Sequence, residues 1–269
     1  MNPPIQTLPP VRTLAADAPL QWLRLGWRDL CRSPWLSLAH GLAFVWGGIA
    51  ITVVAWNRFW LLAGAFSGFL LIAPVLATGL YAISRALERG QATTPALLLR
   101  TWLNWHKGRL HTWDANYWSM ARFGILLALA ATGWVMTSAA LITLTSPVPI
   151  HTPQDFVQHV VLAKDGWVFE LWLAVGGMMA APVFASSAIT MQLLLDRQMP
   201  VFQAVVTSWQ AVLDNTPTMA VWAALIMGLT LVGFATALLG LVVVVPLLGH
   251  ASWHAYRALV DASQWPARD

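Results

Sequence analysis

Five long stretches without Asp, Glu, Lys or Arg dominate this sequence of 269 residues. They run over 33–57, 59–84, 123–154, 171–195 and 215–256. A helix that crosses the ~30 Å hydrocarbon core of a bilayer needs about 20 apolar residues. Because lipid offers no hydrogen-bond partner for the backbone, such stretches fold as α-helices. The pattern therefore predicts an all-α, polytopic membrane protein.

The lengths of these stretches predict six transmembrane helices in three hairpins. We expect spans at about 37–56, 60–84, 122–145 and 168–192. The last stretch is 42 residues long, which is roughly 60 Å of helix and enough for two crossings. The turn between these two spans is expected within 233–240.

Composition agrees with a membrane protein. Only 10% of the residues are charged and 58% are hydrophobic, whereas a soluble domain carries about 25% charged residues. Seventeen tryptophans stand against three tyrosines, and tryptophan favours the membrane–water interface. A single cysteine, Cys31, excludes an internal disulfide framework and a cysteine metal cluster.

The positions of the basic residues predict the orientation. With the amino terminus inside, the outer segments hold only Arg58 and Lys164. Positive charge collects on the cytoplasmic side of membrane proteins, which predicts a bacterial-type inner membrane protein with both termini in the cytoplasm. The basic residues expected inside are Arg12, Arg24, Arg28, Arg32, Arg85, Arg89, Arg100, Lys107, Arg109, Arg122, Arg197, Arg257 and Arg268.

Three prolines indicate an internal repeat. Pro74, Pro182 and Pro246 each lie in the second span of a hairpin, before a charged inner end. The predicted units are 20–90, 95–197 and 200–260, each an interfacial helix followed by a hairpin. The prolines are interpreted either as packing features, because neighbouring helices can satisfy the freed carbonyl, or as kinks around a common cavity, as in transporters.

A short amphipathic segment precedes each hairpin, at 20–33, 95–109 and 200–213. Helices of this kind lie in the interface plane. Basic residues near the inner surface attract anionic lipid by about 1 kcal/mol each, so we expect lipid rather than nucleic acid as their partner. The predicted lipid-binding residues are Arg24, Trp27, Arg28, Arg32, Arg100, Trp102, Trp105, Lys107 and Arg109.

The expected domain organisation is simple. Residues 1–19 hold five prolines and no apolar run, which is typical of a disordered cytoplasmic tail. Residues 20–262 form one six-helix transmembrane domain, and 263–269 form a short cytoplasmic tail.

Candidate sites for chemistry are few. His250 and His254 are four residues apart on one helix face, and His40 is expected at a similar depth. Three imidazoles there form a weak candidate for a metal or haem site; the alternative, which we expect, is polar contact at the boundary without any cofactor. Glu88 and Asp196 are expected to pair locally with Arg89 and Arg197. No catalytic motif occurs, so we assign no catalytic residue.

Several segments resemble a known family. They are Leu239–Arg257, Trp22–Leu30, Gly79-Leu80-Tyr81 and Leu194–Arg197. The chain is similar over about 15–262 to the uncharacterised bacterial membrane proteins grouped as domain of unknown function 2189. The resemblance implies an integral protein of the inner membrane and carries no activity.

Two function classes follow from the sequence. The first is a non-catalytic accessory or scaffold subunit that binds lipid or a membrane protein complex. The second is a small-molecule transporter or channel built on proline-kinked repeats. Stable co-purification with another membrane complex would favour the accessory or scaffold subunit. Uptake by reconstituted vesicles would favour the transporter or channel.

Overall fold

A computed structural model describes residues 8–54, 59–103, 118–146, 148–162 and 167–268. The described chain is helical, and pairing outside the helices is confined to two isolated bridges, Val11 with Val260 and Arg197 with Ala267. This confirms the all-α prediction. The chain divides into two units, the first comprising residues 1–43, 74–123 and 185–269, and the second 44–73 and 124–184.

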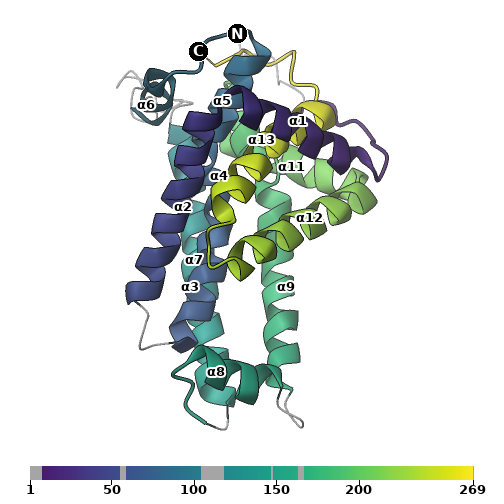
Figure 1. Ribbon diagram of the computed structural model, residues 1–269. Helices are drawn as coiled ribbons and strands as arrows, with labels where there is room; N and C mark the ends of the chain where they lie inside the picture. Colours follow the sequence, from purple (N-terminus) through teal and green to yellow (C-terminus); the bar gives the residue numbers. More distant parts are fainter. Residues whose placement is uncertain (1–7, 55–58, 104–117, 147, 163–166, 269) are drawn as a thin grey trace. The chain divides into compact units, whose positions relative to one another are not determined.

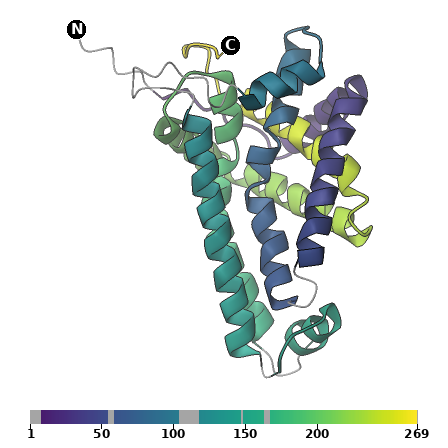
Figure 2. The ribbon, with the colours of Figure 1, turned by 90° about the vertical axis from the view of Figure 1, so that its left-hand side faces the viewer.

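Four described segments are long and apolar enough to cross a membrane. They correspond to expected spans one, three, four and five, and α7 is an uninterrupted helix (Figure 2). Large apolar side chains on these helices are exposed, among them Leu129, Met136 and Met227. Such surfaces are rare in soluble monomers and suit contact with lipid. The segments are α2 (Pro34–Val54), α7 (Trp118–Thr145), α9 (Val168–Ser187) with α10 (Thr190–Asp196), and α12 (Thr216–Ala235).

The expected second and sixth spans do not form long, uniformly apolar helices. The expected second span, 60–84, is divided into α3 (Phe59–Leu71), α4 (Ala73–Leu76) and α5 (Thr78–Glu88). The expected sixth is α13 (Leu241–Leu259), whose last ten residues include two histidines and an arginine and therefore lower its hydropathy. Among the described residues the structure thus gives four candidate spans, and the second and sixth crossings are not confirmed.

The turn between α12 and α13 falls inside the segment 233–240 that the sequence indicates. Residues 236–240 connect the two helices, and Ala237 and Leu238 both have positive φ. This conformation is uncommon for residues with a side chain. The Thr236 hydroxyl accepts a hydrogen bond from the Gly240 backbone N–H at 2.8 Å and closes the turn.

Close backbone approach organises the first unit. Here α1 (Ala18–Arg32) lies against α13 (Figure 1). A Cβ atom added at Gly26 of α1 would lie 2.7 Å from the Ala251 backbone nitrogen, and one at Gly41 of α2 would lie 2.7 Å from Val242 Cα. Small residues permit such contacts between membrane helices, so α1 and α2 both reach the α13 backbone.

The chain ends are also held in the first unit. The Arg12 backbone N–H donates to the Leu259 carbonyl at 2.8 Å, and that of Asp261 donates to the Pro10 carbonyl at 3.0 Å. The Arg268 backbone N–H donates to the Asp196 carbonyl at 2.8 Å. Residues 8–14 and 260–268 therefore pack against the helices, whereas residues 1–7 of the expected disordered tail lie outside the described residues.

In the second unit, residues 148–162 fold over the end of α7. They form α8 (Pro153–Phe156) and a π-helical stretch, η1 (Val157–Val161). The Asp155 carboxylate accepts hydrogen bonds from the backbone N–H groups of His151 and Thr152, and the Thr152 hydroxyl accepts one from the Asp155 N–H. These bonds lower the pKa of Asp155 and form a reciprocal helix cap.

A small apolar core supports this cap. Ile142 of α7, Val160 of η1 and Val168 of α9 are buried together. The indole N–H of Trp172 donates to the Ser138 hydroxyl at 2.8 Å, and that of Trp134 donates to Ser67 at 2.6 Å. Buried indoles need such partners, so these bonds connect α3, α7 and α9 within the second unit.

Candidate functional site

A set of buried and half-buried polar side chains in the first unit joins four helices. We call Asp29, Ser37, Ser84, His250 and His254 the histidine network. His250 Nδ1 lies 2.8 Å from Ser84 Oγ, and its Nε2 lies 2.8 Å from Ser37 Oγ. Asp29 Oδ2 lies 2.8 Å from Ser84 Oγ and 2.7 Å from His254 Nε2. One chain of contacts therefore runs through α1, α5, α13 and α2.

Glycines explain how these elements come close enough. Gly26 places α1 on the α13 backbone, next to Ala251. A Cβ atom added at Gly249 would lie 2.5 Å from Leu80 Cδ1 of α5. His250 follows Gly249 directly and Ser84 lies one turn after Leu80, so the close packing of α13 on α5 brings their side chains into hydrogen-bond distance.

The Asp29 carboxylate is buried but well supplied with donors. Burial alone would raise the pKa of this carboxyl. The hydrogen bond and charge of His254 and the hydrogen bond from Ser84 outweigh burial, so the pKa lies below its ordinary value. Arg28 Nε also lies 3.8 Å from Oδ1. Asp29 is therefore ionised at neutral pH, as a buried charge with partners.

The three candidate metal ligands have hydrogen-bond partners other than one another. His40 Nδ1 bonds to the Leu36 carbonyl of its own helix at 2.8 Å, and both ring nitrogens of His250 bond to serines. Among the described residues, which include all three histidines, no group of three His, Cys, Asp or Glu side chains is placed to hold a metal ion. The imidazoles are used in hydrogen bonds instead.

A second polar cluster surrounds Asp196 at the end of α10. Arg89 donates to its Oδ1 at 3.0 Å, and Arg197 and the Tyr256 hydroxyl donate to its Oδ2 at 3.0 and 2.8 Å. The side chain of Asp196 is 4% exposed. The expected pair with Arg197 is present, and Arg89, which directly follows α5, joins it.

Glu88 does not pair with Arg89, as the sequence suggests, but with residues of α13. Its carboxylate accepts hydrogen bonds from Arg257 and from the Trp253 indole, both at 2.9 Å, and not from the adjacent Arg89, which binds Asp196. Residues next to each other in a helix point in different directions. Arg257 lies on α13, so this pair connects α5 to α13.

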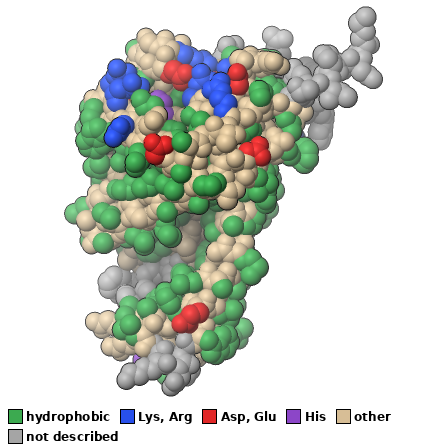
Figure 3. All heavy atoms as spheres, turned by 90° about the vertical axis from the view of Figure 1, so that its right-hand side faces the viewer, with side chains coloured by type: hydrophobic (Ala, Val, Ile, Leu, Met, Phe, Trp, Pro, Cys, Tyr) green, Lys and Arg blue, Asp and Glu red, His purple; other side chains and the backbone are tan. Residues whose placement is uncertain are grey.

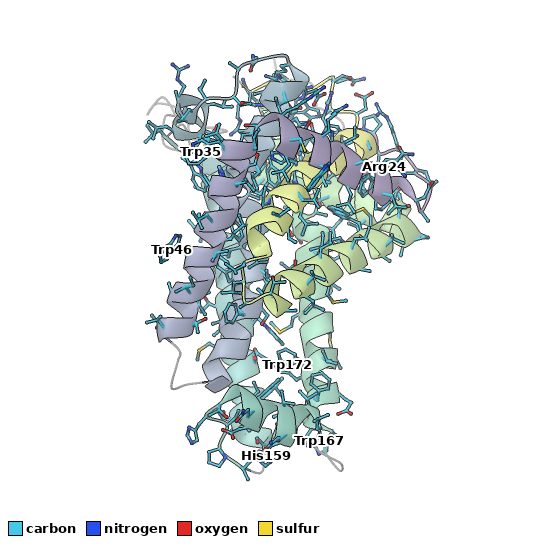
Figure 4. All side chains as sticks on the ribbon, in the orientation of Figure 1. Arg24, Trp35, Trp46, His159, Trp167 and Trp172 are labelled. Carbon is cyan, nitrogen blue, oxygen red and sulfur yellow. The ribbon has the colours of Figure 1, made fainter. Side chains whose placement is uncertain are left out.

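Of the predicted lipid-binding residues, those on α1 are exposed. Arg24, Arg28 and Arg32 are exposed, and Trp27 is 52% exposed; Figure 4 labels Arg24. On α6 (Pro95–Leu103), Arg100 is exposed and Trp102 is half-buried. Trp105, Lys107 and Arg109 lie outside the described residues. Trp35 and Trp46 point away from α2 (Figure 4) and are also exposed.

The side of α1 that packs against the protein is not marked by large apolar residues alone. Its buried residues include Trp22, Gly26 and Asp29, whereas Leu20 and Trp27 are exposed. Lipid-facing and protein-facing sides of a membrane helix are both apolar, and small residues mark the protein contact. In α1, Gly26 marks the side that contacts the protein. Asp29, three residues after Gly26, lies on the same side of the helix.

Charge distribution, fold and surface together define an integral membrane protein with several apolar helices. Every described arginine belongs to the first unit, and Figure 3 shows basic side chains gathered there beside a broad apolar surface. The chain belongs to the family described as predicted integral membrane protein, domain of unknown function 2189, whose model matches residues 61–196. No curated protein and no solved structure matches the chain.

The family match covers part of the resemblance seen in the sequence. Gly79-Leu80-Tyr81 and residues 194–196 fall inside it, whereas 22–30 and 239–257 fall outside. The match includes Ser84 and Asp196 but neither Asp29 nor His250. The family relationship therefore supports membrane insertion and assigns no role to either polar cluster.

Proposed function

We propose that this protein is a multi-pass, non-catalytic protein of a bacterial-type inner membrane, with six crossings and both termini in the cytoplasm. Its role is that of an accessory or scaffold subunit that binds anionic lipid and a membrane protein partner. The observation that carries this proposal is the two-sided structure of α1: one side packs on α13, and the other exposes Trp27 among arginines.

The exposed side of α1 has the chemistry of a lipid contact. Arg24, Arg28 and Arg32 follow one another at four-residue spacing, so they share an edge of the helix. Within the described part of the chain, Arg24 and Arg32 have no acidic partner, and the Arg28 contact to Asp29 is long, at 3.8 Å. Unpaired cations next to exposed Leu20 and Trp27 suit anionic headgroups above an apolar layer.

The carboxylates of the first unit support a structural role. Asp29, Glu88 and Asp196 each bind basic or histidine side chains from another helix. Helices also occur at the three positions expected for interfacial segments, namely α1, α6 and α11 (Val201–Asp214). These features support a packed scaffold built from three repeated units.

Lipid binding is tested on single arginines with a matched control. We expect R24Q and R32Q, alone and combined, to lower the proportion of anionic lipid that co-purifies with the protein in mild detergent. Each basic contact is worth about 1 kcal/mol, so loss of both should weaken the binding of anionic lipid by roughly 30-fold. The control is R12Q, because exposed Arg12 pairs with Asp261 at 3.3 Å. Equal retention by R12Q and the double variant would contradict lipid binding by α1.

Cys31 reports the orientation. It is the single thiol of the chain and is exposed at the end of α1. With the amino terminus inside, a membrane-impermeant maleimide should leave Cys31 unlabelled in intact spheroplasts and label it after lysis. C31S serves as the background control. Labelling in intact spheroplasts would place α1 on the outer side and remove the proposed topology.

One observation favours a small-molecule transporter as a second candidate. The α3–α4–α5 segment is interrupted after Leu71 and Leu76, and Pro182 and Pro246 lie inside α9 and α13. Broken and proline-containing helices line substrate sites in many transporters. Substrate uptake by vesicles containing the purified protein would select this candidate, and stable co-purification with a membrane complex would select the scaffold.

A further inference from the structure

The histidine network contains more close polar contacts than a neutral imidazole and an ionised carboxylate can supply with hydrogens. Four contacts follow one another. Ser37 Oγ lies 2.6 Å from the Ser33 carbonyl and 2.8 Å from His250 Nε2. Ser84 Oγ lies 2.8 Å from His250 Nδ1 and 2.8 Å from Asp29 Oδ2. Each contact is within hydrogen-bond distance and needs one hydrogen between its two atoms.

Counting donors gives one hydrogen too few. Each serine hydroxyl has a single hydrogen, and a neutral imidazole has one N–H. A carbonyl and a carboxylate contribute none. Three hydrogens therefore serve four contacts. If Ser37 donates to the Ser33 carbonyl and Ser84 donates to Asp29, both ring nitrogens of His250 must be donors, which is the imidazolium form.

The neighbouring charges indicate where the extra proton resides. The pKa of Asp29 is below its ordinary value, because the donors from His254 and Ser84 outweigh the effect of burial. The carboxylate thus stays ionised and faces His250 through the Ser84 hydroxyl. Burial of the imidazole and the nearby rings of His254 and His40 oppose its charge, and the charge of Asp29 favours it.

Other titratable groups around His250 lie on several of the packed helices. α1 carries Arg28 beside Asp29, α2 carries His40 one turn after Ser37, and α13 carries His254. Glu88 of α5 is neutralised by Arg257. Asp196 of α10 binds Tyr256, and α12 contains no titratable residue. Asp29 is thus the one carboxylate in this set joined to His250 by a single bridging hydroxyl.

We propose that Asp29, Ser84 and His250 form a buried proton-binding site that takes up one proton and thereby closes the hydrogen-bond chain between α1, α5, α13 and α2. With the proton bound, all four contacts carry a hydrogen. When the proton leaves for water, one contact loses its hydrogen and two lone pairs face each other. Proton binding therefore tightens the packing of α1 on α13. The inference is independent of the scaffold or transporter role.

One end of the chain of contacts reaches the surface of the protein. The side chain of His254 is 12% exposed, whereas that of Asp29 is 2% exposed. His254 and Ser84 share the same carboxylate oxygen, so a proton can move between water and His250 through His254, Asp29 and Ser84. Each step joins atoms 2.7–2.8 Å apart.

The test follows the ring signals of labelled histidine by nuclear magnetic resonance between pH 4 and 9, in detergent. Comparison with H250Q identifies the signal of His250. We expect His250 to change from imidazolium to neutral in this range. The midpoint should fall by about 1 to 3 pH units in D29N and by about one unit in S84A. S252A is the matched control, because Ser252 of α13 bonds to the carbonyl of Leu248 and lies outside the network.

The S252A control and the number of histidine signals that change distinguish loss of the site from loss of folding. Loss of folding would broaden all seven histidine signals, whereas loss of the site moves the His250 midpoint and leaves the signals of the histidines outside the network sharp. A His250 ring that stays neutral across the whole range would overturn the proposal. So would equal midpoints in the parent protein, S84A and S252A.

Discussion

Replacing Gly41 with alanine is expected to lower the melting temperature of the detergent-solubilised protein by about 5–10 °C. A Cβ atom at this position would lie 2.7 Å from Val242 Cα, closer than real Cβ atoms approach backbone. The contacted atoms of Val242 belong to the backbone and not to the flexible end of a side chain, so α2 and α13 must separate. Overpacking of this kind costs about 1–3 kcal/mol, and each kcal/mol corresponds to about 2–4 °C in a chain of this size.

The matched control is G228A. Gly228 lies in α12, another long apolar helix, and a Cβ atom there has no neighbour within 4 Å among the described residues. Alanine is the better helix former, so G228A should melt at the same temperature as the parent protein or slightly above it. An equal loss in both variants would mean that α2 does not approach α13 at Gly41.

The sequence predicts the long helices well, because hydropathy alone decides them. α2, α7, α9 and α12 all lie where uncharged stretches indicate spans. The second and sixth expected spans are harder to predict. An interrupted segment such as α3–α5 and a helix such as α13, with a polar final part, satisfy their polar groups through tertiary contacts that hydropathy does not contain.

The histidine network is predicted in part. Spacing places His250 and His254 on one face of a helix, but it does not identify their partners. Ser84 and Asp29 lie 166 and 225 residues away in sequence from the histidines that they contact. No local pattern connects such positions. The available clue is Asp29 itself, an acidic residue among the three arginines of α1, on the same side as Gly26.

Replacing Asp196 with asparagine is expected to destabilise the protein far more than the same change at Glu88. Both carboxylates bind arginine, but they differ in burial. The Asp196 side chain is 4% exposed, whereas Glu88 and its partner Arg257 are 38% and 37% exposed. Breaking a buried pair costs about 3–5 kcal/mol because the remaining charge loses its partner. An exposed pair contributes about 0–1 kcal/mol.

For D196N we expect a loss of about 3 kcal/mol, at the lower end of that range, because Arg89 is about a third exposed and water replaces part of its interaction. In D196N an NH₂ group replaces one carboxylate oxygen. Arg89, Arg197 and Tyr256 all donate to this carboxylate, so at least one of these donors then faces the NH₂ group and is repelled by it. In E88Q the remaining oxygen still accepts the Trp253 indole hydrogen. Thermal melting of both variants in the same detergent provides the measurement, and an E88Q loss as large as that of D196N would show that burial does not determine the strength of these pairs.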